Sequence, residues 1–500
     1  MSSDLYTTIE ATTGLPKVEQ PLGLFIDNEF VSSTQGEKYD TFNPSTMAKI
    51  TSFYIGNEED VNKATVSSRK AFDGIWSKTS PRERNALLRK LGELIKRDKE
   101  KIALLDCLDA GKPYYSNALI DIDQIIELTE FFSGSSEKFT MGDTIPISTN
   151  KYCYTIKEPF GVVALIVPWN YPFAMACWKI QGALAAGNTV IIKPSELTSL
   201  SLLYAAKLFK EAGFPPGVIN IIPGKGDTVG TALAMHMDID KISFTGSTKV
   251  GGLILECSGK SNLKDVTLEC GGKSAAVILE DADLQNAVES VAEGIFFNSG
   301  QNCTANSRIY VQKTVYDKFI SLLKAHIKQT WKFGSNFDLF SKDCSMGPVI
   351  SKVQYNKITD ILKNVPKEVN VINDPIPDSV KGYFIPPTIL TNVEQSSDLM
   401  QQEIFGPVTC VSQFSTYEEA IKLANDSKYG LAAMVFTSNI DSANKFARDI
   451  KAGTVWINSS NEEEVSVPFG GYKMSGIGRE LGKSGVESFL QTKTIHVPVR

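Results

Sequence analysis

Short runs of apolar residues, separated by segments with helical periodicity, constrain the fold of this chain more than any other feature. The runs occupy residues 161–168, 189–193, 218–222 and 241–244. The first of them has no alternation with polar residues, which is typical of a parallel strand covered on both faces. Helical segments such as 200–212 lie between the runs. Strands that alternate with helices predict a doubly wound parallel sheet.

A second series of strands and helices begins near Ser274 and ends near Asn458. We expect a helix over 315–331 and a surface insertion over the polar stretch 364–381. The expected strands are residues 274–279, 308–312, 408–414, 431–437 and 453–458. Because 500 residues exceed one ordinary core, we predict an α/β protein of two or three domains.

Local patterns predict several single elements. Residues 24–31 have the pattern of a hairpin with an Asp-Asn turn. Ser80, followed by a proline and by Glu83, predicts a helix start with a capping box. Two extended segments, 151–157 and 488–500, have no partner close in sequence. They are expected to pair with each other or across subunits.

The composition excludes several classes of function. The chain is 42% hydrophobic and 22% charged, as in soluble globular proteins. Its net charge of -6 argues against nucleic acid or an anionic membrane as the main partner. It has no apolar stretch long enough to span a membrane. Its first ten residues resemble neither a secretory nor a mitochondrial leader, so we expect a cytoplasmic protein.

The cysteines and histidines are spread singly along the chain. None of the eight cysteines forms a C-x-x-C pair, and the three histidines are isolated. The histidines are His236, His326 and His496. We therefore expect no disulfide framework, no metal site and no histidine-based triad.

Polar and glycine-rich loops follow the first four strands. These loops are residues 168–172, 193–196, 223–230 and 245–251. Ligands of doubly wound sheets bind beyond the carboxyl ends of the strands. A helix that starts at Ser247 would also direct free N–H groups at a phosphate. The third loop is one residue too long for the dinucleotide fingerprint, and ordinary turn glycines remain the alternative to a phosphate site.

Cys303 stands at a joint between a helix and a strand, where a substrate could reach it. It follows an apolar helical run and comes after a glycine and two amides. A free cysteine is more often a small buried hydrophobe. However, Glu269 ends another strand and Asn170 follows a third. A thiol nucleophile, a carboxylate base and an amide donor are the groups that acyl chemistry needs.

Motifs along the chain carry a family resemblance. They are residues 168–170, 193–196, 244–248, 268–273, 300–303, 403–408 and 468–471. With these motifs the chain strongly resembles the NAD(P)-dependent aldehyde dehydrogenase superfamily from about residue 21 to its end. The resemblance implies a Rossmann-like NAD-binding domain, an α/β catalytic domain and a small β oligomerisation element in a homo-oligomer, a dimer or a tetramer. The corresponding ranges are 1–139 with 159–270, then 271–470, then 140–158 with 485–500.

The resemblance also implies the roles of individual residues. Cys303 would attack the aldehyde, Asn170 would help to hold the oxyanion, and Glu269 would activate the water that hydrolyses the thioester. Glu403 and Phe405 would position the nicotinamide end of the cofactor. The remaining cofactor residues implied are Ile166, Val167, Pro168, Trp169, Lys193, Ser195, Glu196, Gly226, Gly230, Phe244, Gly246, Ser247, Val250 and Gly271.

Glu196 bears on the choice of cofactor. A carboxylate accepts hydrogen bonds from the ribose hydroxyls and repels a 2′-phosphate. We therefore predict NAD, with NADP less favoured. A CoA-acylating dehydrogenase would not need Glu269, and a non-enzymatic scaffold protein would be expected to lack the nucleophile or the base. Both remain alternatives to be tested.

The substrate is less constrained than the reaction. The chain is most similar to fungal cytosolic aldehyde dehydrogenases of the stress-induced, 3-aminopropanal-oxidising type, on residues 456–465. Three consecutive carboxylates within this stretch, of which Glu462 and Glu463 are the candidates, could attract a cationic amine. A solvated charge run at a subunit edge is the alternative, and a general aliphatic aldehyde is the alternative substrate. The walls of the substrate tunnel are predicted to be Tyr171, Met175, Trp178 and Phe469.

Overall fold

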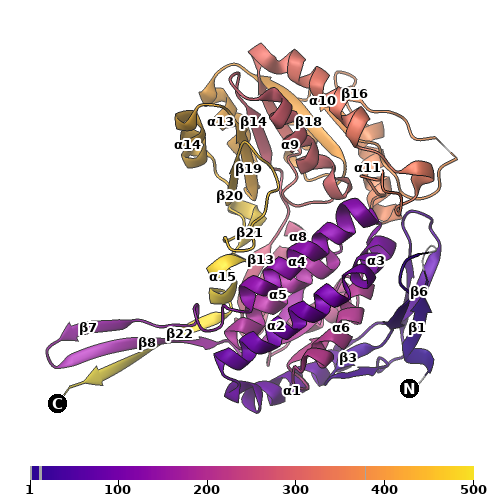
Figure 1. Ribbon diagram of the computed structural model, residues 1–500. Helices are drawn as coiled ribbons and strands as arrows, with labels where there is room; N and C mark the ends of the chain where they lie inside the picture. The colour runs from indigo at the N-terminus through magenta and orange to yellow at the C-terminus, as the bar shows by residue number, and fades with distance from the viewer. Residues whose placement is uncertain (1–2, 11–13, 378, 500) are drawn as a thin grey trace.

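The chain forms two α/β units and a projecting arm, as Figure 1 shows. The computed structural model describes residues 3–10, 14–377 and 379–499. The other residues, some of which fall within the ranges given above, lie outside the described part of the chain. The predicted α/β class with two separate sheets is confirmed.

The first sheet has eight strands in the order β21-β13-β12-β9-β10-β11-β3-β4. Its five central strands run parallel, whereas β3, β4 and β21 pair antiparallel at its edges. The strands are β3 (Leu24–Ile26), β4 (Glu29–Val31), β9 (Val162–Ile166), β10 (Thr189–Lys193), β11 (Ile219–Ile221), β12 (Lys241–Thr245), β13 (Asp265–Glu269) and β21 (Gly476–Ile477). The predicted hairpin thus extends the sheet, and β21 reaches it from near the other end of the chain.

Strand β9 shows why the first run is apolar throughout. Val163 and Leu165 pack into one core, whereas Val162 and Ala164 pack into the core on the other side of the sheet. Successive side chains of a strand point to opposite faces, so a strand covered on both faces can be apolar at successive positions. Burial of each Val or Leu contributes about 1.5–3 kcal/mol.

Helices cover both faces of the first sheet (Figure 1). One face is covered by α5 and α6, with α2, α3 and α4 packed outside them; the other is covered by α1, α7 and α8. These helices are α1 (Glu58–Asp73), α2 (Pro81–Arg97), α3 (Lys99–Ala110), α4 (Leu119–Phe132), α5 (Pro172–Ala186), α6 (Leu200–Ala212), α7 (Thr231–Met235) and α8 (Thr248–Lys260). Helix α6 has the predicted bounds, and the capping box of α2 is present between Ser80 and Glu83.

The second sheet has seven strands in the order β16-β17-β18-β15-β14-β19-β20, all parallel except β16. Its strands are β14 (Ala275–Ile278), β15 (Arg308–Gln312), β16 (Asn370–Ile372), β17 (Thr388–Thr391), β18 (Val408–Phe414), β19 (Ala432–Phe436) and β20 (Thr454–Ile457). Its helices are α9 (Leu284–Phe296), α10 (Tyr316–Thr330), α11 (Lys352–Lys363), α12 (Asp398–Gln401), α13 (Tyr417–Asn425) and α14 (Ile440–Asp449). The polar stretch predicted as a surface insertion is mostly exposed and contributes β16 to the sheet edge.

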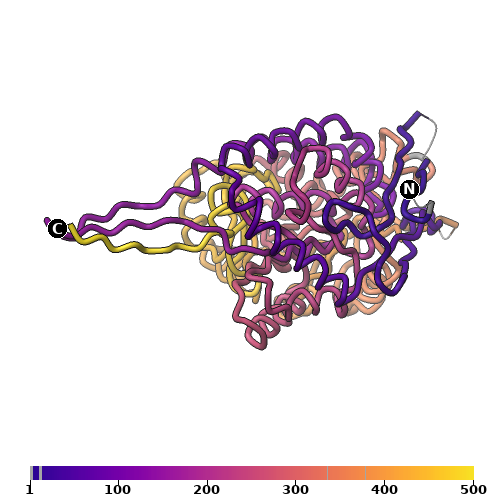
Figure 2. The backbone as a smooth tube through the Cα atoms, turned by 90° about the horizontal axis from the view of Figure 1, so that it is seen from below, coloured from indigo at the N-terminus to yellow at the C-terminus, as the bar shows by residue number. Residues whose placement is uncertain are grey.

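The arm is a three-stranded antiparallel sheet that projects away from the body, as Figure 2 shows. Strands β8 (Lys151–Pro159) and β22 (Leu490–Pro498) pair along their whole length. The two extended segments without local partners therefore pair with each other. Strand β7 (Thr144–Ser148), which had not been expected, pairs with β8 on the other side. Helix α15 (Gly482–Glu487) precedes the last strand.

Two small hairpins complete the structure at the N-terminal side. They consist of β1 (Tyr6–Ile9) with β2 (Val18–Pro21), and β5 (Lys38–Phe42) with β6 (Lys49–Tyr54). Across the residues that the structure describes, no helix combines the length and the apolar character needed to cross a bilayer. The domain boundaries proposed above remain a prediction.

Candidate active site

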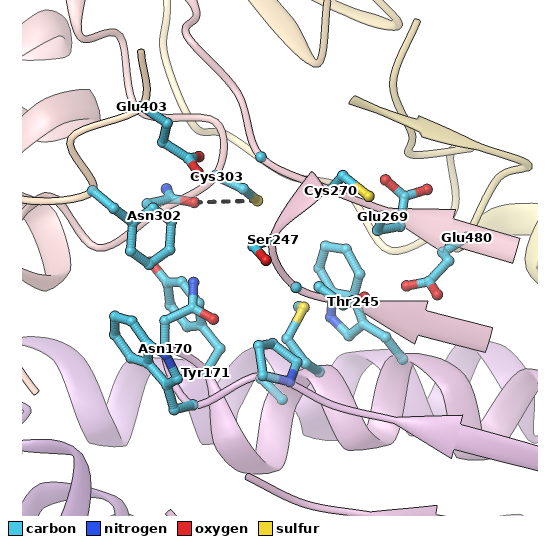
Figure 3. A pocket seen from close by; sticks show the side chains of 18 of the residues that line it. Asn170, Tyr171, Thr245, Ser247, Glu269, Cys270, Asn302, Cys303, Glu403 and Glu480 are labelled. Carbon is cyan, nitrogen blue, oxygen red and sulfur yellow. Dashed lines mark hydrogen bonds between the residues drawn. The ribbon is translucent and has the colours of Figure 1, made fainter. Parts of the chain in front are cut away.

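A cavity of about 270 Å³ lies where the carboxyl ends of β9, β12 and β13 face the second α/β unit. Figure 3 shows Cys303, Asn170 and Glu269 around this cavity on three separate segments. Its lining is Gln124, Pro168, Trp169, Asn170, Tyr171, Ala174, Met175, Trp178, Thr245, Gly246, Ser247, Glu269, Cys270, Gly271, Asn302, Cys303, Gln354, Lys357, Glu403, Phe405, Glu463, Phe469 and Glu480. The three candidate catalytic residues, distant in sequence, therefore share one cavity.

The loop before Cys303 has an unusual backbone. Asn298, Ser299 and Gly300 follow one another with φ angles of 51°, 57° and 70°. This left-handed region is costly for residues with a side chain, although Asn tolerates it best. A Cβ at Gly300 would also overlap the carbonyl oxygen of Gly406. The turn places Cys303, which is partly exposed, in the cavity wall.

The surroundings of Cys303 favour the protonated form of its thiol. Burial, followed by the carboxylates of Glu463, Glu403 and Glu269, raises the pKa of the thiol well above its usual value. The Cys303 backbone N–H opposes this shift, so it faces the sulfur. The sulfur also lies 3.8 Å from the Asn302 Oδ1 (Figure 3). The thiolate, which is the reactive form, becomes more abundant as the pH rises.

Asn170 is held beside the nucleophile by the same loop. Its Nδ2 donates to the carbonyl of Gln301 at 3.0 Å, and its own carbonyl accepts from Asn298 Nδ2 at 3.0 Å. An amide nitrogen has two N–H groups, so one remains to donate into the cavity. Asn170 is thereby positioned as a donor next to Cys303.

Glu269 is a buried carboxylate at the end of β13, with 4% of its surface exposed. Neither of its oxygens has a hydrogen-bond partner among the described protein atoms. Burial, followed by the carboxylate of Glu480, raises its pKa well above the usual value, whereas Lys179 and Arg479 lower it. Lys179 also forms a buried ion pair with Glu480. A carboxylate with a raised pKa and free lone pairs has the character of a general base.

The predicted nicotinamide residues lie at one side of the cavity. Glu403 Oε1 accepts from the backbone N–H of Gly272 at 2.8 Å, and a Cβ at Gly271 would overlap the Glu403 carboxylate. The rings of Phe405 and Trp169 meet edge to face, with centroids 5.3 Å apart. The backbone of Gly271 and Gly272 and the carboxylate of Glu403 therefore lie close together at this side of the cavity.

Other predicted cofactor residues continue from the cavity along the carboxyl edge of the first sheet. Ser247 caps the N-terminus of α8 and accepts from the Val250 N–H at 3.4 Å. Lys193, at the end of β10, has its Nζ 3.6 Å from Glu196. Predicted cofactor residues outside the cavity lining are Ile166, Val167, Lys193, Ser195, Glu196, Gly226, Gly230, Phe244 and Val250.

Most of the predicted substrate residues line the cavity, and one does not. Tyr171, Met175, Trp178, Phe469 and Glu463 line the cavity. The rings of Trp178 and Phe469 pack edge to face at 5.3 Å. Burial, followed by the charge of Asp121, raises the pKa of Glu463 to about 7.

Glu462 and Glu464, the neighbours of Glu463, are exposed and lie outside the cavity lining. The main-chain oxygen of Glu462 accepts from Trp456 Nε1 at 2.9 Å. The three carboxylates are therefore not equivalent, and only Glu463 is placed to meet a ligand in the cavity.

Several lining residues carried no signal in the sequence analysis. These residues are Gln124, Ala174, Gln354, Lys357 and Glu480. Cys270, which directly follows Glu269, also lines the cavity. Within the described ranges, no cluster of His, Cys, Asp or Glu is arranged to hold a metal ion.

Comparison with known proteins identifies the family to which this chain belongs. The model of the aldehyde dehydrogenase family matches residues 30–495. Aldehyde dehydrogenase [NAD(P)+] 1 of Saccharomyces cerevisiae is 60% identical over 498 residues, which cover 99% of this chain and 98% of that protein. The yeast aldehyde dehydrogenase [NAD(P)+] 2 is 59% identical with the same coverage.

Solved structures agree with these matches. The NAD+ complex of an aldehyde dehydrogenase from Bacillus cereus superposes with a TM-score of 0.93 at 42% identity, covering 99% of this chain and 100% of that one. Betaine aldehyde dehydrogenase from Staphylococcus aureus, in complex with NAD+, superposes with a TM-score of 0.91 at 39% identity, covering 95% and 94%. The chain therefore belongs to the aldehyde dehydrogenase family of oxidoreductases.

Proposed function

We propose that this chain oxidises an aldehyde to the carboxylic acid with NAD+, through a thioester on Cys303. The observation that carries the proposal is the presence of Cys303, Asn170 and Glu269 around one cavity. These groups supply a nucleophile, an oxyanion donor and a base. The yeast relatives, named for NAD(P)+, support a nicotinamide cofactor.

The residues around the cavity fit a dinucleotide. Helix α8 has thirteen residues, and its N-terminus opens at Ser247 on the cavity; such helix ends hold phosphates. Gly246 and Gly271 keep the backbone of the cavity wall free of side chains. When bound, NAD+ supplies a hydride acceptor for the oxidation.

The residues that would hold this cofactor follow its length along the sheet edge. Glu403 and Phe405 would hold the nicotinamide end, and Ser247 the pyrophosphate. Lys193 and Glu196 would hold the adenosine ribose, and the carboxylate of Glu196 favours NAD over NADP.

The side chains of this protein carry the remaining steps. The Cys303 thiolate, formed when the thiol proton is lost to water, adds to the aldehyde carbon and gives a thiohemiacetal anion, whose oxyanion accepts from the free N–H of Asn170 and the backbone N–H of Cys303. Each such donor is worth about 3–4 kcal/mol. Loss of the hydride leaves a thioester. Glu269 then removes a proton from the water that attacks the thioester carbonyl, and collapse of the intermediate releases the acid and the Cys303 thiolate.

NADH formation with an aliphatic aldehyde, measured with and without CoA, tests the proposal. We expect NADH without CoA in the wild type and none in Cys303→Ala. A dependence on CoA would identify a CoA-acylating enzyme, which Glu269 argues against. No NADH under either condition would favour a non-enzymatic scaffold and refute the proposal.

We further propose 3-aminopropanal or a related aminoaldehyde as a substrate, with a general aliphatic aldehyde as the alternative. The support is the position of Glu463 in the cavity lining, which Glu462 and Glu464 do not join. A cationic amine would be attracted to this end of the cavity, whereas a neutral aldehyde would not.

The arm is proposed to join subunits of a homo-oligomer, a dimer or a tetramer. Its strands expose apolar side chains on a thin sheet, namely Ile145, Ile147, Tyr152 and Ile156. Exposed apolar surface of this kind marks interaction sites. Light scattering after size exclusion would give the mass, and a monomer would refute this role.

A further inference from the structure

Lys112 is a buried cation that the reaction described above does not use. It follows α3, and only 1% of its surface is exposed. Its Nζ donates to Asp121 Oδ2 at 2.6 Å and to Asn117 Oδ1 at 3.3 Å, and lies 3.8 Å from the centre of the Tyr171 ring. Buried ammonium groups are costly and persist only with such partners.

The ammonium determines how a chain of buried amides is oriented. Because an ammonium group can only donate hydrogen bonds, Asn117 must turn its oxygen towards Lys112. The Nδ2 of Asn117 then donates to Asn298 Oδ1 at 3.2 Å. Asn298 in turn must present its Nδ2 to the opposite side. Each orientation follows from the one before it.

The last amide in this chain holds the loop of the nucleophile. Asn298 Nδ2 donates to the carbonyls of Asn170 and Gln301 at 3.0 and 3.2 Å. Asn298 is also the first of the three left-handed residues that lead to Cys303. If its amide were reversed, an oxygen would face two carbonyl oxygens, and this repulsion would oppose the left-handed turn.

We propose that Lys112 is a positioning residue for catalysis, which acts through Asn117 and Asn298 to set Cys303 and Asn170 at their places in the cavity. The proposal rests on the proposed function, because it assumes that these two residues react. Lys112 itself does not line the cavity. Its effect is the direction that its charge imposes on the two amides.

The sharpest test is Asn117→Asp, because Lys112 keeps an acceptor while the donor to Asn298 is lost. We expect kcat to fall about 10- to 100-fold, as for a displacement of about 1 Å at a reacting group. The KM for NAD should change little, because the cofactor residues are intact. The melting temperature should fall, because a second buried carboxylate then shares the one ammonium of Lys112. The rate of Cys303 alkylation by iodoacetamide should also change.

The double variant Lys112→Met/Asp121→Asn separates orientation from charge burial. It removes both members of the ion pair, so neither charge is left without its partner, yet the amides lose their fixed direction. We expect the loss of kcat to persist in this variant. Wild-type kcat in either folded variant would overturn the proposal, and Asn117→Asp alone decides the question if the double variant does not fold. Failure of the proposed function would instead appear as a wild type that forms no NADH.

Discussion

The substitution Glu463→Gln isolates the charge that is proposed to select the substrate. Glu463 is the member of the three-carboxylate run that lines the cavity, whereas Glu462 and Glu464 are exposed. The variant keeps the size and the polarity of the side chain and removes only its negative charge. We expect the preference for 3-aminopropanal over propanal to fall.

Coulomb's law gives the size of this effect. Two opposite charges about 5 Å apart attract by about 3 kcal/mol at an effective dielectric of 20. Desolvation of the amine and the carboxylate opposes this attraction, which leaves about 1–2 kcal/mol. Since about 1.4 kcal/mol is tenfold in an equilibrium constant, the ratio of the two kcat/KM values should fall about 5- to 30-fold.

The pH dependence of the same ratio supplies an independent check. Burial and Asp121 raise the pKa of Glu463 to about 7, so the carboxylate is mostly protonated at pH 6 and mostly ionised at pH 8. A primary amine, with a pKa of about 10, stays cationic over this range. The preference for the aminoaldehyde should therefore rise from pH 6 to pH 8 in the wild type and stay flat in Glu463→Gln.

Steady-state assays with both aldehydes at saturating NAD+ measure these ratios. Glu462→Gln is the matched control, because it removes a neighbouring charge that lies outside the cavity lining. It should leave the ratio within twofold of the wild type. An unchanged ratio in Glu463→Gln, or an equal fall in both variants, would refute a specific role for Glu463.

The other predictions concern the base, the cofactor and the nucleophile loop. Glu269→Gln should lower turnover about 10²–10⁴-fold, the range of general-base catalysis, and should still form one equivalent of NADH as a burst in stopped-flow measurements. Since burial and Glu480 raise the pKa of Glu269, turnover of the wild type should increase as the pH rises. Glu196→Gln should raise kcat/KM for NADP relative to NAD, because the repulsion of a 2′-phosphate is removed; an unchanged ratio in steady-state assays would contradict this. Gly300→Ala should destabilise the fold by more than about 1 kcal/mol in urea unfolding, because its φ is 70° and its Cβ would overlap Gly406.

The fold could be predicted wherever its signals are local. The runs at β9 and β10 are apolar because both of their faces are buried, and this property is readable from the residues alone. The neighbouring strand with which a strand pairs cannot be read from the residues in this way. Strand β21 spans two residues and joins the first sheet from a part of the chain more than 200 residues after β13, and such short edge strands have no period to detect.

The residues of the candidate site likewise include some that could be predicted from the sequence and some that could not. Cys303 and Glu269 stand at ends of expected elements, so they could be selected from their places in the pattern. Glu480 could not, because an isolated carboxylate near a glycine is an ordinary surface pattern. It reaches the cavity through tertiary packing and a buried ion pair with Lys179. Lys112 was missed for the same reason, since its role depends on partners from several elements.

The charge of Glu463 affects binding of the substrate amine and reactivity of the Cys303 thiol in opposite directions. After burial, its charge is the first contributor to the raised pKa of the Cys303 thiol, so the carboxylate that would attract an amine also holds the nucleophile in its unreactive form. Removing that charge should therefore have effects of opposite sign in one variant. In Glu463→Gln the aminoaldehyde preference should fall, while alkylation of Cys303 by iodoacetamide at pH 7 should become faster than in the wild type. Slower alkylation would mean that Glu463 assists the thiol, and that its charge is not kept at the expense of thiol reactivity.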